Sequence, residues 1–267
     1  MKTTIYIACH KEYWNPNNIC YQRIHVGAAN SNSKLATLCD DTGDSISIKN
    51  KNYCELTGLY WIWKNDKVSD IVGLCHYRRY FAFKEEKNFI AEVIAGIKNK
   101  GYIEKIVDPV EIERYFDCYD IILPVPEVFN ESINEQYCDC HDADNWSVLR
   151  DIVKTLFPEY AVSMESVFKG RRMYPYNMFV MKKSTFDGYM KWLFAILERV
   201  EELITIGSDP YQSRVLGFMG ERLLNLYVYH HRLRVKEMPI VFIDDNQGGI
   251  KYREKGWRRV IREFIGK

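Results

Sequence analysis

The sequence Asp70-Ile71-Val72-Gly73-Leu74-Cys75 is a short apolar run that leads directly into His76-Tyr77-Arg78-Arg79-Tyr80. Such a run is typical of a strand that is buried on both faces of a sheet. The polar residues after it then lie at the carboxyl end of a central strand, where ligands bind in α/β sheets. Because two guanidiniums beside an imidazole present several donors, we expect His76, Arg78 and Arg79 to bind a diphosphate. The alternative is a surface turn with ordinary exposed charges.

Outward from this stretch, predicted strands alternate with predicted helices. We expect strands over 3–8, 119–124, 178–181 and 239–243. We expect helices over 52–64, 144–156, 158–168, 186–203 and 220–229. Residues 10–50 are rich in Asn, Asp, Gly and Ser and indicate mainly a long functional loop region. The alternation predicts an α/β fold whose sheet is covered on both faces.

Composition excludes several classes of protein. The 267 residues carry 37 Lys plus Arg against 36 Asp plus Glu, and this balance argues against a general nucleic-acid binder. No apolar stretch has the length of a signal sequence core or a transmembrane helix, so we expect a cytoplasmic protein. In that reducing compartment the eight cysteines are expected to be free thiols.

Two carboxylate features are candidates for chemistry. The segment Asp40-Asp41-Thr42-Gly43-Asp44 is either a solvent-exposed turn or a site where Asp41 and Asp44 hold a divalent cation or a sugar hydroxyl. Glu221 is expected at the start of a helix, where it either complements the helix dipole or acts as a general base. Phosphate-binding loops and the Rossmann glycine pattern are absent from the sequence, which disfavours ATP hydrolysis of that type and dinucleotide binding.

The C-terminal segment 246–267 is basic with interspersed apolar residues, and we treat it as an appendage to a domain formed by residues 1–245. A helical face would be shared by Trp257, Ile261, Phe264 and Ile265, with arginines beside them. This face either lies on an anionic membrane surface or packs onto the domain.

Nine blocks of the sequence together resemble a family of bacterial capsular and exopolysaccharide glycosyltransferases that was long known only as a domain of unknown function. The blocks cover residues 5–11, 24–28, 41–47, 52–57, 60–65, 73–81, 176–182, 214–218 and 221–224. They include Tyr6-Ile7-Ala8-Cys9-His10-Lys11, Cys75-His76-Tyr77-Arg78-Arg79-Tyr80 and Tyr176-Asn177-Met178-Phe179. The resemblance extends from residue 3 to about residue 243.

The resemblance implies the single-domain nucleotide-sugar glycosyltransferase fold of the GT-A type, with a mixed central sheet flanked by helices. It implies transfer of a hexosyl unit from a UDP-sugar onto a growing surface polysaccharide such as a capsule, exopolysaccharide or O-antigen. Some members look like galactofuranosyltransferases. The acceptor would be a glycan or a lipid-linked glycan, with peripheral contact to the inner membrane as an option.

The resemblance also suggests roles for single residues. Relatives of the fold carry an Asp-x-Asp metal motif where this chain has His76-Tyr77-Arg78, which puts a Mn²⁺ or Mg²⁺ cofactor in doubt. We expect direct displacement with inversion, with Glu221 and His76 as catalytic residues. The residues that we expect to bind the donor and its phosphates are Arg78, Arg79, Asp41, Asp44, His10 and Lys11. Assigned to the acceptor are Tyr176, Asn177 and His141.

Two other functions stay open at the level of the sequence. One is a non-catalytic subunit that binds a glycan or nucleotide within a polysaccharide assembly complex. The other is a nucleotidyltransferase, although the glycine-rich, basic triphosphate loop that such enzymes carry near the first strand is not visible.

Overall fold

The computed structural model describes residues 1–85, 87 and 89–255. In this part of the chain, eleven strands form one mixed sheet, and β8 and β9 form a separate pair. The strands of the large sheet are β1 (Thr3–Cys9), β2 (Tyr21–His25), β3 (Leu38–Cys39), β4 (Ile71–His76), β5 (Arg79–Phe81), β6 (Ile90–Ala95), β7 (Ile121–Pro124), β10 (Phe179–Lys182), β11 (Val235–Met238), β12 (Ile240–Ile243) and β13 (Ile250–Glu254). The small pair consists of β8 (Glu127–Val128) and β9 (Arg172–Met173).

The first part of the sheet has the order β3-β2-β1-β4-β10-β7-β11. Strands β1 to β4 run parallel to one another, and β10 lies antiparallel between β4 and β7. Strand β4 therefore lies in the middle of the sheet, as the apolar run before His76 predicts. The α/β fold with a mixed sheet is confirmed.

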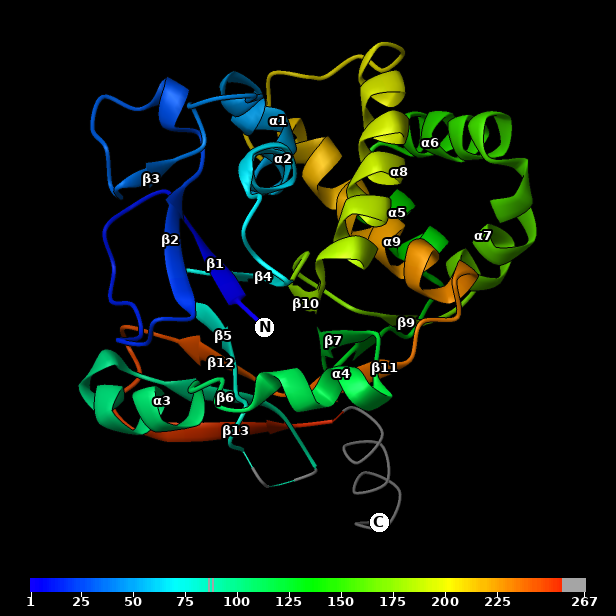
Figure 1. Ribbon diagram of the computed structural model, residues 1–267. Helices are drawn as coiled ribbons and strands as arrows, with labels where there is room; N and C mark the ends of the chain where they lie inside the picture. The colour runs from blue at the N-terminus through cyan, green and yellow to red at the C-terminus, as the bar shows by residue number, and fades with distance from the viewer. Residues whose placement is uncertain (86, 88, 256–267) are drawn as a thin grey trace, which may run out of the picture.

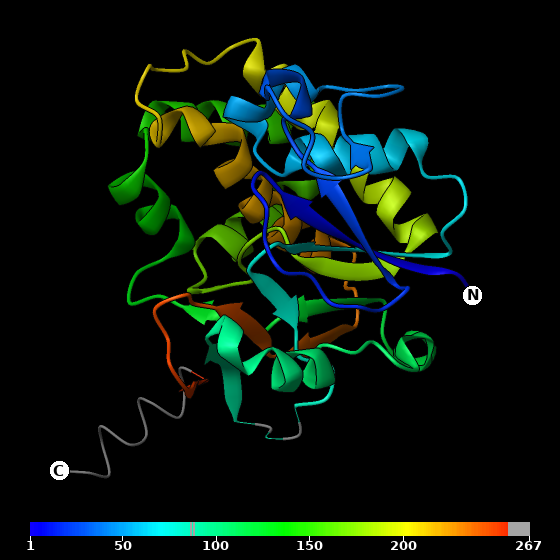
Figure 2. The same ribbon diagram turned by 90° about the vertical axis from the view of Figure 1, so that its left-hand side faces the viewer.

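The second part of the sheet consists of β5, β12, β6 and β13. It joins the first part where β4 pairs with β5 through His76 and Arg79. In Figure 2, β1 and β2 of the first part lie above β6 and β13 of the second part. The stretch His76–Tyr80 is thus the corner between the two parts, which places its polar side chains at the end of a central strand.

Helices cover both faces of the sheet (Figure 1). They are α1 (Asn50–Tyr53), α2 (Leu56–Asn65), α3 (Lys100–Ile106), α4 (Tyr115–Cys118), α5 (Ile133–Cys140), α6 (Ala143–Leu156), α7 (Ala161–Phe168), α8 (Lys183–Glu201) and α9 (Val215–His230). Two apolar clusters lie on opposite faces: Tyr6 and Ala8 belong to one, and Ile5 and Ile7 belong to the other. Because neighbouring residues of a strand point to opposite faces, this division shows that β1 is buried on both sides. In the described part of the chain, no helix is both long and apolar enough to span a bilayer.

Several predicted elements differ from the structure. The helix predicted over 52–64 is two helices, because Cys54 has a φ of 52° and interrupts the chain between α1 and α2. The loop predicted over 10–50 contains β2 and β3, whose mixed polar sequences hide their pairing with β1 and with each other. The last predicted helix starts at Val215, not at Gly220.

The C-terminal segment is described only in part. Its residues Ile250–Glu254 form β13, which pairs with β6 and so belongs to the sheet. The proposed apolar face of Trp257, Ile261, Phe264 and Ile265 lies outside the described residues.

Candidate active site

A cleft of about 870 Å³ opens at the carboxyl ends of the parallel strands. Ala8 and Val26 line it at the ends of β1 and β2, and the segment His76–Arg79 lines it at the end of β4. The opposite wall comes from the junction of α1 and α2 and from α9. This is the place where open α/β sheets bind their ligands.

Six of the residues predicted for the site line this one cleft, although they come from four separate parts of the sequence. They are His10, His76, Arg78, Arg79, Tyr176 and Glu221. Two further predicted residues lie just outside its lining. The Lys11 ammonium is 5.8 Å from the ring centroid of Tyr77, and His141 stacks at 4.2 Å on Phe218, which itself lines the cleft.

A two-residue turn of unusual backbone conformation organises the cleft. Tyr176 and Asn177 have φ values of 76° and 51°, and consecutive left-handed residues other than glycine cost about 1–3 kcal/mol each. The Tyr176 carbonyl accepts a hydrogen bond from His76 Nε2 at 2.7 Å, and the Tyr176 backbone also hydrogen-bonds to the Glu221 carboxylate. The buried Asn177 donates through Nδ2 to Glu55 Oε1 at 2.7 Å. This turn therefore fixes one histidine and two carboxylates relative to one another.

Glu221 is the seventh residue of α9, so its predicted place at the start of a helix is wrong. Glu221 therefore does not complement the dipole of α9 as a first-turn residue, because that effect is confined to the first turn of a helix. Burial raises the pKa of Glu221 to about 7, with a further rise from Glu55 and an opposing effect of Arg222. The side chain is still 21% exposed, so its carboxylate can reach a ligand in the cleft.

The neighbouring Arg222 contacts Glu221, although adjacent residues of a helix usually point in different directions. Its Nη1 lies 3.3 Å from Glu221 Oε2. The guanidinium is held mainly by other partners, since it also donates to the Phe218 carbonyl at 3.0 Å and to Gln136 Oε1 at 2.6 Å. Glu221 is thus in contact with a cation that is already shared among several acceptors.

Two glycines of α9 bring the helix close to the junction of α1 and α2. A Cβ atom at Gly217 would lie 3.1 Å from Cys54 Sγ, and one at Gly220 would lie 2.9 Å from Leu56 Cδ1. Both distances are shorter than ordinary contacts, so larger residues would push α9 away. Glu55 follows Cys54 directly and lines the cleft with Glu221. The glycines therefore allow the two carboxylates to share one site.

Arg79 is the cation in the cleft that is most available to an anion. Its guanidinium lies between two aromatic rings, 4.6 Å from the centroid of Tyr176 and 4.7 Å from that of Phe242. Its Nε is buried without a hydrogen-bond partner, and within the described chain no carboxylate lies within 4.0 Å of it. A buried donor without a partner is costly, which indicates that a ligand supplies the acceptor.

The other arginines of the cleft are partly occupied. Arg78 Nε donates to the Ile243 carbonyl at 2.7 Å, and its Nη2 is 3.8 Å from Asp244. Arg214, which the sequence analysis did not assign to the site, donates through Nε to Cys54 Sγ at 3.3 Å and lies over the ring of Phe218. Both still present N–H groups beside the cleft.

The hydrogen bond of His76 determines its tautomer. A carbonyl oxygen only accepts, so Nε2 carries the proton that is shared with Tyr176. Burial lowers the pKa of His76, which keeps the ring neutral at pH 7. A neutral ring whose one N–H is engaged has only an acceptor left at Nδ1. His76 therefore holds the Tyr176–Asn177 turn and does not provide the predicted N–H to a phosphate.

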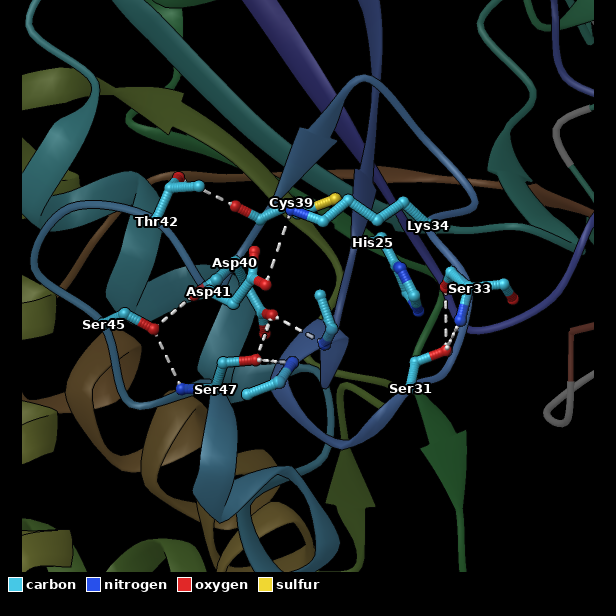
Figure 3. Close-up of polar contacts among 12 residues, drawn as sticks. His25, Ser31, Ser33, Lys34, Cys39, Asp40, Asp41, Thr42, Ser45 and Ser47 are labelled. Atoms are coloured by element: carbon cyan, nitrogen blue, oxygen red, sulfur yellow. Dashed lines mark hydrogen bonds and ion pairs between the residues drawn. The ribbon is translucent and has the colours of Figure 1, made fainter.

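The aspartate turn is a structural element of the loop before α1. Asp40 is fully buried and accepts hydrogen bonds from Gly27 N, Ala28 N, Ser47 Oγ and Thr57 Oγ1 at 2.5–3.0 Å. Figure 3 shows the Asp40 carboxylate beside Ser47, one of these donors. Asp41 and Asp44, which were predicted to bind the donor or a metal, do not line the cleft.

Both of those aspartates have other partners. Asp41 Oδ2 lies 3.7 Å from Lys34 Nζ (Figure 3), and Asp44 Oδ1 accepts from the Tyr60 hydroxyl at 3.1 Å. Within the described residues, no three His, Cys, Asp or Glu side chains are grouped so that they would hold a metal ion. The described donor set therefore does not fit a metal ion.

Comparison with known proteins shows that this chain is similar to a glycosyltransferase. The chain matches the apo structure of WbbM, a bifunctional glycosyltransferase, with a TM-score of 0.85 and 33% sequence identity. The match covers 93% of this chain and 47% of the WbbM chain, so this chain spans about half the length of that relative. Curated proteins gave no match. The model of a family described as "Domain of unknown function (DUF4422)" matches residues 4–232, and the chain therefore belongs to this family.

Proposed function

We propose that this chain is a glycosyltransferase that moves a hexosyl unit from a UDP-sugar onto a glycan acceptor of a surface polysaccharide. One observation carries the proposal: Glu221, whose carboxylate has a pKa of about 7, and Arg79, whose buried Nε has no hydrogen-bond partner, line the same cleft at the strand ends. A base and an anion site side by side are what transfer from a nucleotide diphosphate requires. The fold shared with WbbM supports the same class of reaction.

The reaction is a direct displacement at the anomeric carbon. The acceptor hydroxyl oxygen forms a bond to that carbon while the bond to the diphosphate oxygen breaks. Glu221 takes the hydroxyl proton, and the nucleotide diphosphate leaves with the bonding electron pair. The attack comes from the face opposite the leaving group, so the anomeric configuration inverts.

Glu221 is suited to its role by its pKa. A general base works best when its pKa lies near the working pH, because it is then both ionised and basic enough to accept a proton. A carboxylate at the ordinary value of 4.5 would be a much weaker base. The Tyr176 backbone bond fixes the direction of the carboxylate, and His76 fixes that backbone.

The leaving group is stabilised by the arginines. Arg79 provides an unpaired buried N–H, and Arg78 and Arg214 add further donors from the two sides of the cleft. Hydrogen bonds of this charged type contribute about 1.5–3 kcal/mol each. His10 and Tyr77, which contact each other at the end of β1, provide aromatic faces for the nucleoside. Of the donor sugars, a galactofuranosyl unit is the one that the family resemblance suggests.

The donor half of the proposal is tested without an acceptor. Titration calorimetry with UDP, UDP-galactopyranose and UDP-galactofuranose should show binding that is weakened in Arg79→Ala and kept in Glu221→Gln. Arg114→Ala, an exposed arginine in an ion pair on another surface, serves as the matched control. Lack of binding to any uridine nucleotide would contradict the proposal.

The catalytic half is tested by release of UDP. Wild-type chain incubated with the bound UDP-sugar and lipid-linked oligosaccharide from bacterial membranes should release UDP and label the acceptor. A non-catalytic subunit would bind but release none, so binding without release would favour that second function.

A further inference from the structure

A second cavity of about 870 Å³ lies between α7, the carboxyl half of α9 and the segment that leads into β9. It does not overlap the candidate active site in its lining residues. The two share a wall, however. Tyr174 and Asn225 line the second cavity, while Tyr176 and Glu221, two and four residues away from them, line the cleft.

The second cavity is basic. Arg171, Arg172, Arg232 and His230 line it, and no Asp or Glu is among its lining residues in the described chain. Arg172 forms an ion pair with Glu237, which is not among the residues that line the cavity. Arg171 and Arg232 have no carboxylate within 4.0 Å among the described residues. Two guanidiniums that form no salt bridge among the described residues therefore line a concave surface, although the charge of Arg171 also interacts with Glu135, and such an arrangement favours phosphate.

The rim of the cavity is apolar and exposed. Val162 is 79% exposed and Tyr229 is 55% exposed, and both line the cavity. Tyrosine is enriched where proteins meet the membrane interface, because its ring is apolar and its hydroxyl is polar. A basic cavity with such a rim fits an anionic lipid headgroup better than a neutral sugar, because a neutral sugar has no charge to pair with the arginines.

The end of the described chain lies on the same side of the molecule. Lys255 is close enough to Arg172 for their charges to interact, and this repulsion contributes to a lowered pKa of Lys255, after burial and Lys236. The sequence continues from there with Arg258, Arg259 and Arg262. The sequence shortly after Lys255 thus adds further positive charge, and the charge of Lys255 itself interacts with that of Arg172, which lines the cavity.

We propose that this cavity binds the phosphate of an anionic phospholipid headgroup and thereby docks the chain on a membrane surface. Arg171 and Arg232 contact the phosphate, and Val162 and Tyr229 enter the interfacial layer. Basic pockets of this kind are a known means of headgroup recognition. Docking here brings the shared wall, and with it the active-site cleft, close to the membrane.

The test uses the full chain and sedimentation with vesicles. Vesicles of phosphatidylcholine containing phosphatidylglycerol should bind the chain, and pure phosphatidylcholine vesicles should not. The double variant Arg171→Glu/Arg232→Glu should lose about tenfold or more in binding, because each basic residue near an anionic surface contributes about fivefold. The control Lys67→Glu/Lys98→Glu has the same change in charge at exposed positions on other surfaces and should lose much less.

Three results would overturn the proposal. The first is no binding of the wild-type chain to anionic vesicles, and the second is equal loss in the two double variants. The third is binding that disappears in Arg258→Glu/Arg259→Glu but persists in Arg171→Glu/Arg232→Glu, which would assign binding to the C-terminal segment. If the first result is found and calorimetry shows binding of inorganic phosphate, the cavity is a phosphate site that serves no membrane. None of these results depends on glycosyl transfer, so the proposal and the enzymatic function fail independently.

Discussion

Replacing Glu221 with glutamine separates catalysis from structure in this cleft. The amide has nearly the same shape, so it keeps the packing of α9 against the α1–α2 junction, but it cannot accept a proton as a base. General bases contribute about 10²–10⁴-fold in rate, and we expect a loss of at least about a hundredfold in turnover. Donor binding should stay within a fewfold of wild type, because the arginines are unchanged.

The same substitution has a calculable effect on stability. The pKa of Glu221 is raised from 4.5 to about 7, so the folded chain disfavours the ionised form. At about 1.4 kcal/mol per pKa unit, the ionised carboxylate costs roughly 3 kcal/mol at pH 8. The favourable contribution of this group is complete below pH 4.5 and is lost as the pH rises through about 7. Glu221→Gln removes that loss, so it should be more stable than wild type at pH 8 and similar to it at pH 5.

The assays are UDP release and urea unfolding, each measured from pH 5 to pH 9. For the wild-type chain, the rate at low substrate should rise as the pH passes through about 7, where Glu221 becomes ionised. Turnover of Glu221→Gln within a fewfold of wild type would refute the role of the base. A variant that is less stable than wild type at pH 8 would refute the account of its buried charge.

Four further predictions follow from the same contacts. Arg79→Ala should weaken UDP binding by about 1.5–3 kcal/mol in calorimetry, since it removes a charged hydrogen bond, and unchanged binding would place the diphosphate elsewhere. Activity should survive exhaustive chelation with EDTA, because the described donor set does not fit a metal; turnover restored only by Mn²⁺ or Mg²⁺ would contradict this. Gly220→Val should lower the free energy of unfolding by about 1–3 kcal/mol, because its side chain would overlap Leu56, and stability equal to wild type would show that α9 can move freely. Asp40→Ala should lower it by about 3 kcal/mol or more, since four donors lose a buried carboxylate, with thermal unfolding as the measurement.

The sequence predicts those parts of the fold that depend on local patterns. The apolar run before His76 marks β4 without any knowledge of its neighbours, because a strand buried on both faces must be apolar throughout. The chemistry of His76, Arg78 and Arg79 at its end then leads directly to the cleft. Strands β2 and β3 give no such signal, because their sequences are partly polar. The main evidence for them is that β2 pairs with β1 and β3 pairs with β2.

The rest of the cleft depends on contacts between distant segments. Glu55 and Arg214 lie 159 positions apart, and they meet only because Gly217 and Gly220 let α9 approach the α1–α2 junction. Within the aspartate run, residue type cannot distinguish the buried Asp40 from the more exposed Asp41 and Asp44. That distinction depends on Gly27 N and Thr57, which come from either side of the run.

The backbone bond between Tyr176 and Glu221 makes one amide proton a spectroscopic probe of the cleft. The chemical shift of a backbone amide is sensitive to the charge of the group that it hydrogen-bonds to, so the resonance of Tyr176 should titrate with the protonation of Glu221. In a ¹⁵N-labelled sample, its midpoint near pH 7 would report the ionisation of this carboxylate directly, without substrate. Because the carbonyl of the same residue is tied to His76, a nucleotide that displaces the turn would shift this resonance even at constant pH.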